Sequence, residues 1–279
     1  MLCLALNLSA QGTISIEDAE AFENAQWQVV DLGKGAQVKQ ARIEMFNSVQ
    51  VISILKYPAR RFTTVHHCAE GKEASVPSKI GEKNKALAVV NAGFFRVKSR
   101  TMGVYLKVDG KVICHKPLPK LHRLNGLVGF KDKKGHRLMI EPCDTLQYDA
   151  VSGKWHTAMS SGPVLMKNGK IVAPEKWWIN EKPVFYEGRH PRTVIGKDKK
   201  GNMYMVVIDG RFPSQAEGTT IYETAQICGL IGMSDAINLD GGGSTALWTN
   251  VTGVINHPCD NKKYDHTGER IVPSTIVVY

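Results

Sequence analysis

Acidic and hydroxyl side chains follow an apolar run near the end of this sequence, in a segment rich in glycine. Residues 236–245 run from apolar positions to Asp240, then through three glycines to Ser244 and Thr245. Consecutive glycines let the backbone approach a ligand closely, and hydroxyl groups suit phosphate or sugar oxygens. The segment has neither the Gly-Lys-Ser/Thr ending of a Walker loop nor the spacing of a dinucleotide fingerprint. It predicts a site for an oxygen-rich ligand and disfavours nucleotide binding.

A second group of polar residues follows the apolar run at residues 203–208. Asp209 ends that run, Arg211 follows two residues later, and Glu217 lies beyond a short loop. A buried carboxylate is costly unless it is paired, so a structural salt bridge between Asp209 and Arg211 competes equally with a functional Asp209. Arg192 enters the partner strand of the same hairpin, and its planar guanidinium suits bidentate binding of phosphate.

Three further positions combine polar side chains with loop-like surroundings. His190 is interpreted either as a proton donor near neutral pH or as an exposed bystander. Asn91 has an amide suited to a ligand hydroxyl, whereas Phe94 and Phe95 are assigned to the core. Ser161 lacks the setting of a nucleophile elbow, so we assign it a binding role.

The order of these motifs resembles the phosphodiester glycosidase family. The resemblance covers about residue 85 to the C-terminus, and a closing segment that contains Arg270 extends it. Ile271 and Ser274 depart from the usual pattern there, where proline and asparagine are common. The segments that carry the resemblance are residues 91–95, 161–163, 192–193, 209–211, 218–219 and 238–245.

The resemblance implies a hydrolase that cleaves the glycosidic C–O bond of a sugar-1-phosphodiester with an N-acetylglucosamine-like sugar. Arginine side chains would neutralise the phosphate, and an aspartate would stabilise the oxocarbenium-like centre or activate water. The catalytic residues predicted in this way are Asp240, Asp209 and Arg192. The substrate-binding residues predicted are Asn91, Gly93, Ser161, Arg211, Glu217, Gly242, Gly243, Ser244, Thr245 and Arg270.

Two other functions stay open on the sequence. The carboxylates of Asp209, Glu217 and Asp240 are hard oxygen ligands that suit Ca²⁺ or Mg²⁺, as in a metal-dependent phosphodiesterase on glycan or cell-envelope phosphodiesters. The same cationic and hydroxyl-rich loops also suit a binding module for anionic carbohydrates. For the glycosidase, nothing in the sequence requires a cofactor, and we assign no metal ligands.

Short β-type runs joined by tight turns must position these side chains. Asp109-Gly110 and Asn168-Gly169 supply the positive φ angles of two-residue hairpin turns. A further hairpin pairs residues 192–196 with residues 203–209, and the second run is apolar enough for a central strand. This hairpin carries Asp209 to the end of a strand.

Helices are fewer than strands in the predicted structure. Thr220 and Glu223 form the pattern of a capping box, which predicts a helix from about residue 219 to 231. A second helix is predicted between residues 78 and 85. Because strands dominate and hairpins join them, the predicted fold class is α+β, with mixed, largely antiparallel sheets and a few packed helices.

Bulk composition supports one large domain, over residues 12–279. The chain has 279 residues, of which 43% are hydrophobic, so it can bury a substantial core. Its formal charge of +10 is compatible with an anionic substrate. The densest basic runs, residues 131–135 and 197–201, lie between β-rich runs, as exposed hairpin tips do, so nucleic acid is not an expected partner. No apolar run approaches the roughly 20 residues that a membrane span needs.

The N-terminus and the cysteines bear on localisation. Residues 1–11 resemble the last part of a secretory signal peptide without its positive region, and an N-terminal strand is the alternative. We therefore predict a secreted or periplasmic, bacterial protein. The six cysteines lack CxxC spacing, which disfavours a zinc ribbon and a thioredoxin-type pair. Their disulfide connectivity and the oligomeric state are left undetermined.

Overall fold

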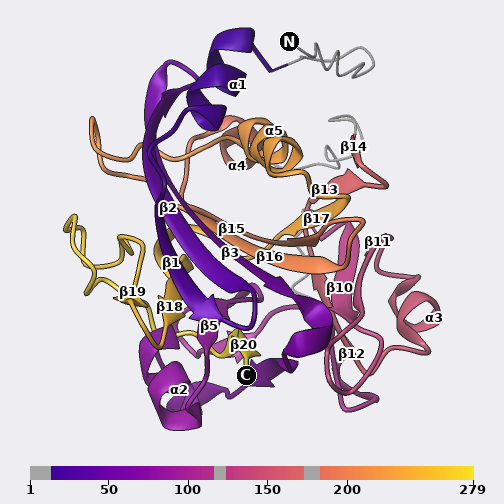
Figure 1. Ribbon diagram of the computed structural model, residues 1–279. Coiled ribbons are helices and arrows are strands. Elements are labelled where there is room, and N and C mark those ends of the chain that lie inside the picture. Colours follow the sequence, from indigo (N-terminus) through magenta and orange to yellow (C-terminus); the bar gives the residue numbers. More distant parts are fainter. Residues whose placement is uncertain (1–13, 116–123, 173–182) are drawn as a thin grey trace.

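Three β-sheets and a two-stranded ribbon form most of the protein (Figure 1). The computed structural model describes residues 14–115, 124–172 and 183–279. The eight-stranded sheet contains, in spatial order, β1 (Gln28–Gly33), β2 (Ala36–Met45), β3 (Ser48–Pro58), β16 (Asn202–Ile208), β15 (Arg192–Lys197), β17 (Asp235–Asn238), β13 (Val164–Lys167) and β14 (Lys170–Ile171).

Two five-stranded sheets flank the large one. The first contains β11 (Leu138–Pro142), β10 (Gly126–Phe130), β12 (Thr157–Ser161), β8 (Leu106–Val108) and β9 (Lys111–Cys114). The second contains β19 (Gly253–Val254), β18 (Leu247–Thr249), β5 (Ala88–Asn91), β20 (Ser274–Val278) and β4 (Thr64–Cys68). The ribbon pairs β6 (Phe95–Arg96) with β7 (Thr101–Met102).

The strand pairs described are all antiparallel. The α-helices within the described ranges are α1 (Ile16–Glu23), α2 (Pro77–Asn84), α3 (Tyr148–Ser152), α4 (Pro183–Glu187) and α5 (Ile221–Ile231). The predicted α+β class with largely antiparallel sheets is confirmed.

The predicted hairpins form where the turn residues placed them. Asp109 and Gly110 have φ angles of 49° and 75°, and Asn168 and Gly169 have 54° and 80°. Asparagine, aspartate and glycine tolerate these left-handed angles better than other residues, so each pair closes a tight turn. The β15–β16 hairpin pairs Arg192 with Ile208 and ends at the predicted basic tip.

The two predicted helices are also present. Thr220 caps α5, and its hydroxyl and the Glu223 carboxylate form both hydrogen bonds of the capping box. The helix ends at Gly232, whose φ of 84° suits a left-handed C-cap. The predicted helix between residues 78 and 85 is α2, which has Pro77 at its first position.

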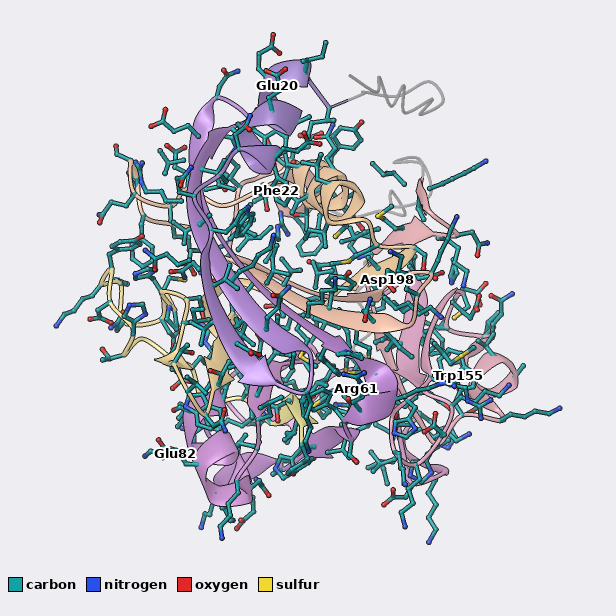
Figure 2. All side chains as sticks on the ribbon, in the orientation of Figure 1. Glu20, Phe22, Arg61, Glu82, Trp155 and Asp198 are labelled. Carbon is teal, nitrogen blue, oxygen red and sulfur yellow. The ribbon has the colours of Figure 1, made fainter. Side chains whose placement is uncertain are left out.

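Apolar side chains fill the spaces on both faces of the eight-stranded sheet. One cluster lies between this sheet and the two smaller ones, and another is covered by α1, α4 and α5 (Figure 1). Phe22 of α1 packs edge-on against Trp27 at 5.3 Å beneath the helix, while Glu20 is exposed (Figure 2). The core thereby holds β15, β16 and β17 in place, and these strands lead to the site described below.

Several predictions concern the surface and the termini. No helix in the described ranges is long and apolar enough to cross a membrane. Five cysteines, Cys68, Cys114, Cys143, Cys228 and Cys259, are free thiols. The predicted signal-peptide remnant and Cys3 lie outside the described residues.

Candidate active site

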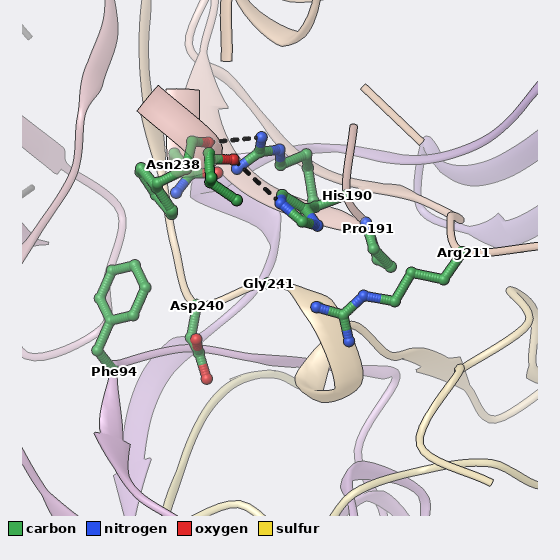
Figure 3. A pocket seen from close by; sticks show the side chains of 11 residues that line it. Phe94, His190, Pro191, Arg211, Asn238, Asp240 and Gly241 are labelled. Atoms are coloured by element: carbon green, nitrogen blue, oxygen red, sulfur yellow. Dashed lines mark hydrogen bonds between the residues drawn. The ribbon is translucent and has the colours of Figure 1, made fainter. Parts of the chain in front are cut away.

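A cavity of about 340 Å³ opens beside the C-terminal end of β17 (Figure 3). An acid, three cationic or basic side chains and several apolar groups line it. In Figure 3, Asp240 lies between Phe94 and Arg211. The lining residues are Phe94, Val184, Phe185, His190, Pro191, Arg192, Arg211, Asn238, Asp240, Gly241 and Gly242.

The backbone at Asp240 is held by a segment from the neighbouring sheet. The Asp240 amide donates to the Ala92 carbonyl at 2.9 Å, and Asn91 Nδ2 donates to the Asp240 carbonyl at 2.6 Å. Asn91 Oδ1 in turn accepts from the Thr193 hydroxyl at 2.9 Å and from the Ala246 amide at 3.2 Å. Asn91 is 1% exposed and does not line the cavity. Asn91 therefore positions the backbone of Asp240 through these hydrogen bonds.

Other groups lie close to each of the three consecutive glycines. A Cβ at Gly241 would lie 2.6 Å from the Pro191 carbonyl oxygen. At Gly242, with a φ of 61°, a Cβ would lie 2.9 Å from Arg211 Nη2, and at Gly243 it would lie 2.3 Å from Arg270 Nη2. The loop after Asp240 is therefore packed against two guanidinium groups.

Arg192 is largely committed to the backbone around the cavity. Its Nε donates to the Thr219 carbonyl at 2.8 Å, and its Nη2 donates to the carbonyls of Phe185 and Gly188 at 2.9 Å each. The guanidinium carbon also lies 5.2 Å from the centre of the Phe185 ring. These contacts tie α4 to the cavity wall while the charge of Arg192 stays at the cavity.

Arg211 has a freer guanidinium group. Among the described residues no carboxylate oxygen lies within 4.0 Å of it, and its Nη1 contacts Cys259 Sγ at 3.8 Å. The backbone of Arg211 is left-handed, with a φ of 70°, which is unusual for a residue with a side chain. The side chain reaches into the cavity toward the glycine loop (Figure 3).

His190 lines the cavity and is partly buried. Its Nε2 lies 3.1 Å from the Val184 carbonyl, which can only accept, so Nε2 carries a proton. Burial, and then the charge of Arg192, hold the pKa of His190 below its ordinary value. The neutral ring thus has its lone pair on Nδ1, and near neutral pH it is a proton acceptor. The exposed-bystander interpretation was wrong about its location.

Asp209 lies away from the cavity lining and has other partners. Its carboxylate accepts from Asn256 Nδ2 at 3.0 Å, from the His257 amide at 3.0 Å, and from His257 Nδ1 at 2.8 Å. Its hydrogen-bond partner is therefore His257, and the competing interpretation of a salt bridge with Arg211 was wrong. The Asp209 side chain is fully buried, and it fixes the segment that follows β19.

The other predicted binding residues support the site from outside the lining. Ser161 donates to the Asn238 carbonyl at 2.7 Å, the Gly93 amide donates to Ser274 Oγ, and Thr245 lies 3.3 Å from Thr193 Oγ1. Ser244 is buried, and Glu217 faces Arg189 at 3.8 Å. Of the predicted set, the cavity gathers Asp240, Arg192, Arg211 and Gly242.

Arg270 lies just behind the glycine loop and not in the lining. It forms an ion pair with Asp260, with Nε at 2.9 Å from the carboxylate. Burial alone would lower the pKa of Arg270, but the hydrogen bond and charge of Asp260, and then the charge of Asp240, raise it. Arg270 therefore adds positive potential next to Asp240 without facing the cavity.

Sequence reasoning missed several lining residues. Asn238 stood inside the glycine-rich motif, and its spacing of two residues from Asp240 could have revealed it. Phe94 was assigned to the core, and it both packs there and lines the cavity. Val184 and Phe185 had no local signal, because α4 reaches the cavity only through the contacts of Arg192 and His190.

The predicted metal ligands are not gathered in the described part of the chain. Asp209 is bound to Asn256 and His257, Glu217 faces Arg189, and Asp240 lines the cavity. No group of three or more His, Cys, Asp or Glu residues suited to a metal ion occurs in the described ranges. A metal requirement stays a prediction that activity with a chelator can test.

Comparison with known proteins identifies the class of hydrolase to which this chain belongs. The sequence model of the phosphodiester glycosidase family matches residues 84–279, which are 196 of the 279 residues of the chain. The protein therefore belongs to the phosphodiester glycosidase family.

Named relatives agree with this assignment. The bovine (Bos taurus) N-acetylglucosamine-1-phosphodiester alpha-N-acetylglucosaminidase is 34% identical over 70 residues, which are 25% of this chain and 13% of the bovine protein. The matched region thus spans a small part of that relative. The catalytic domain of the zebrafish enzyme of the same name has a similar fold, with a TM-score of 0.69, 16% identity and coverage of 91% of this chain and 87% of that chain.

Bacterial structures share the fold as well. A hypothetical protein from Synechocystis has a TM-score of 0.66 at 14% identity, covering 90% of this chain and 63% of that chain. A putative exported protein from Burkholderia pseudomallei has a TM-score of 0.59 at 16% identity, covering 82% of this chain and 74% of that one. At these identities the comparison supports the common fold.

Proposed function

We propose that this protein hydrolyses the glycosidic C–O bond of a sugar-1-phosphodiester whose sugar resembles N-acetylglucosamine. The observation that carries the proposal is the placement of Asp240 in one cavity with Arg211 and Arg192. Membership of the phosphodiester glycosidase family supports it. The sugar is suggested by the names of the bovine and zebrafish relatives.

The two arginines have different parts in this proposal. Arg211, whose guanidinium is free of carboxylates among the described residues, binds the phosphate and stabilises the charge that develops on it. Arg192 is held by three backbone carbonyls, so it contributes positive potential and keeps the wall formed by α4 in place. Arg270 adds potential from behind the glycine loop.

Asp240 acts at the anomeric carbon. A phosphate leaving group already carries negative charge, so it needs less protonation than an alcohol does. Catalysis therefore depends mainly on groups near the sugar, where a carboxylate stabilises an oxocarbenium-like centre or activates water. His190, with its lone pair on Nδ1, is a second acceptor in the same cavity. Asp209, which is buried and bound to His257, supports the site from outside the cavity.

Hydrolysis in ¹⁸O-labelled water tests which bond is cleaved. The substrates are UDP-N-acetylglucosamine and a simple alkyl N-acetylglucosamine-1-phosphodiester, each assayed with and without EDTA. Label in the released sugar supports the glycosidase, whereas label in the phosphate would identify a phosphodiesterase and refute the proposal. Loss of activity with EDTA would add a metal ion to the site.

The Asp240→Asn variant tests the catalytic assignment. We expect kcat/KM to fall at least about 100-fold with little change in Tm, because the variant keeps the shape of the side chain and removes its charge. Asp31→Asn is a matched control at an exposed position of β1, where the carbonyl oxygen of asparagine can still accept from Gly33. Equal activity of the Asp240→Asn variant and the wild type would refute the role of Asp240.

A further inference from the structure

A buried carboxylate and a histidine join two segments of the chain behind the cavity. Asp209 follows β16, and His257 belongs to residues 256–260, which follow β19. His257 Nδ1 lies 2.8 Å from Asp209 Oδ2, and the His257 amide donates to both carboxylate oxygens at 3.0 Å. The carboxylate accepts, so Nδ1 carries the proton of this bond. The side chains of Asp209 and His257 are 0% and 14% exposed, so water competes little with the bond.

The same two segments meet again two residues further along. Arg211 comes two residues after Asp209, and Cys259 comes two residues after His257. Arg211 Nη1 contacts Cys259 Sγ at 3.8 Å, and Cys259 shares a buried cluster with Phe212. Of these residues, Arg211 alone lines the cavity. The segments are therefore joined both at the buried pair and at the side chain that faces the ligand.

The conformation of Arg211 depends on support from its surroundings. Its backbone φ of 70° is left-handed, and such a residue keeps this angle only where neighbouring groups hold it. Within the described ranges, no carboxylate oxygen within 4.0 Å directs its guanidinium group. A long arginine side chain has many rotamers when nothing restrains it. The contact with Cys259 is thus one of the restraints on the guanidinium group.

We propose that His257 is a positioning residue for phosphate binding: its bond to Asp209 keeps Cys259 against Arg211 and thereby holds the guanidinium group at the cavity. The inference rests on the proposed function, in which Arg211 binds the phosphate. Removal of the Nδ1 donor leaves the buried carboxylate short of one hydrogen bond, so residues 256–260 must shift to admit water. Arg211 then samples more rotamers and binds phosphate more weakly. Binding of the sugar alone does not change.

Two variants of His257 separate its hydrogen bond from its bulk. His257→Leu fills similar space without a donor. His257→Asn keeps an N–H close to the original position, because Nδ2 of asparagine and Nδ1 of histidine are both bonded to Cγ. His156→Leu is a matched control that removes another histidine paired with a carboxylate, because His156 Nε2 lies 2.9 Å from Asp109 Oδ1.

Isothermal titration calorimetry of the intact protein measures the effect with two probes, N-acetylglucosamine-1-phosphate and N-acetylglucosamine. We expect His257→Leu to bind the sugar phosphate about tenfold more weakly than the wild type, because a displaced charged donor loses most of its contact. Its affinity for the neutral sugar should stay within about twofold. His257→Asn and His156→Leu should match the wild type within about twofold for both probes. Thermal melting checks that each variant folds.

Cys259→Ala provides a second test if His257→Leu does not fold. This variant keeps the bond between Asp209 and His257 but removes the sulfur that Arg211 contacts. We expect it to bind the sugar phosphate at least about threefold more weakly, with unchanged affinity for the neutral sugar. If the neutral sugar gives no measurable heat with the wild type, the sugar phosphate series decides alone.

The outcomes separate this inference from the proposed function. Unchanged affinity of His257→Leu for the sugar phosphate, an equal loss for both probes, or a loss in His257→Asn as large as in His257→Leu would each overturn the role of His257. No binding of the sugar phosphate by the wild type would overturn it as well. A phosphate-selective loss in His257→Leu, without turnover of any phosphodiester by the wild type, would support the role of His257 and refute the glycosidase.

Discussion

Gly243→Ala tests whether close packing in the loop after Asp240 favours glycine at this position. An added Cβ would lie 2.3 Å from Arg270 Nη2 and 2.6 Å from Asp260 Oδ1. Favourable contacts begin near 3.5 Å, so both side chains must retreat by roughly 1 Å. The retreat separates the Arg270–Asp260 ion pair and moves a positive charge that acts on Asp240.

The cost of this change has two parts. Overpacking costs about 1–3 kcal/mol, toward the lower end here because the atoms that clash are the ends of flexible side chains. The ion pair is about a third exposed, and such pairs contribute less than about 1 kcal/mol. We therefore expect the free energy of unfolding to fall by about 2 kcal/mol and Tm to fall by about 4 °C.

Urea unfolding of four proteins checks this reasoning. They are the wild type, Gly243→Ala, Arg270→Ala and the double variant. If Arg270 causes the clash, Gly243→Ala should cost less than about 1 kcal/mol in the Arg270→Ala background. Gly229→Ala in α5 is a matched control, because its Cβ would meet nothing within 4 Å, and it should stabilise by up to about 1 kcal/mol. Additive effects of Gly243→Ala and Arg270→Ala would refute the explanation.

Two further predictions concern stability. Asp209→Asn should lower the free energy of unfolding by about 2–3 kcal/mol in urea, because the amide nitrogen that replaces Oδ2 cannot accept from His257 Nδ1; unchanged stability would show that this bond contributes little. Burial, and next the charge of His67, lower the pKa of His66 to about 4, so the unfolded chain binds the proton more tightly. Stability should be complete above about pH 6.5 and should fall by about 3 kcal/mol as the pH drops to 4. His66→Gln should remove this pH dependence, and an equal dependence in both proteins would contradict the assignment.

Local interactions explain why the sequence predicted these hairpins and the capped helix. The hairpin turns at Asp109-Gly110 and Asn168-Gly169 depend on the φ preferences of the turn residues themselves. The capping box of α5 joins Thr220 to Glu223, three residues apart. Because each signal and its structural partner lie close together in the chain, the sequence contains all the information needed.

The roles of the two aspartates could not be assigned in this way. Asp209 and Asp240 each follow an apolar run and precede glycine, so they look alike in the sequence. In the fold, Asp209 accepts hydrogen bonds from His257, 48 residues away, and is buried. Asp240 instead enters the cavity, where Asn91, 149 residues away, holds its backbone.

The sequence by itself determined the predicted hairpins with their turns, the capped helix and the family of the protein. Only the tertiary structure decided which polar side chains face the cavity and which groups pack against the three glycines. The physical reason is that turns and caps are satisfied by neighbours in the chain, whereas the partners of a buried polar group come from distant segments that meet only when the sheets pack together.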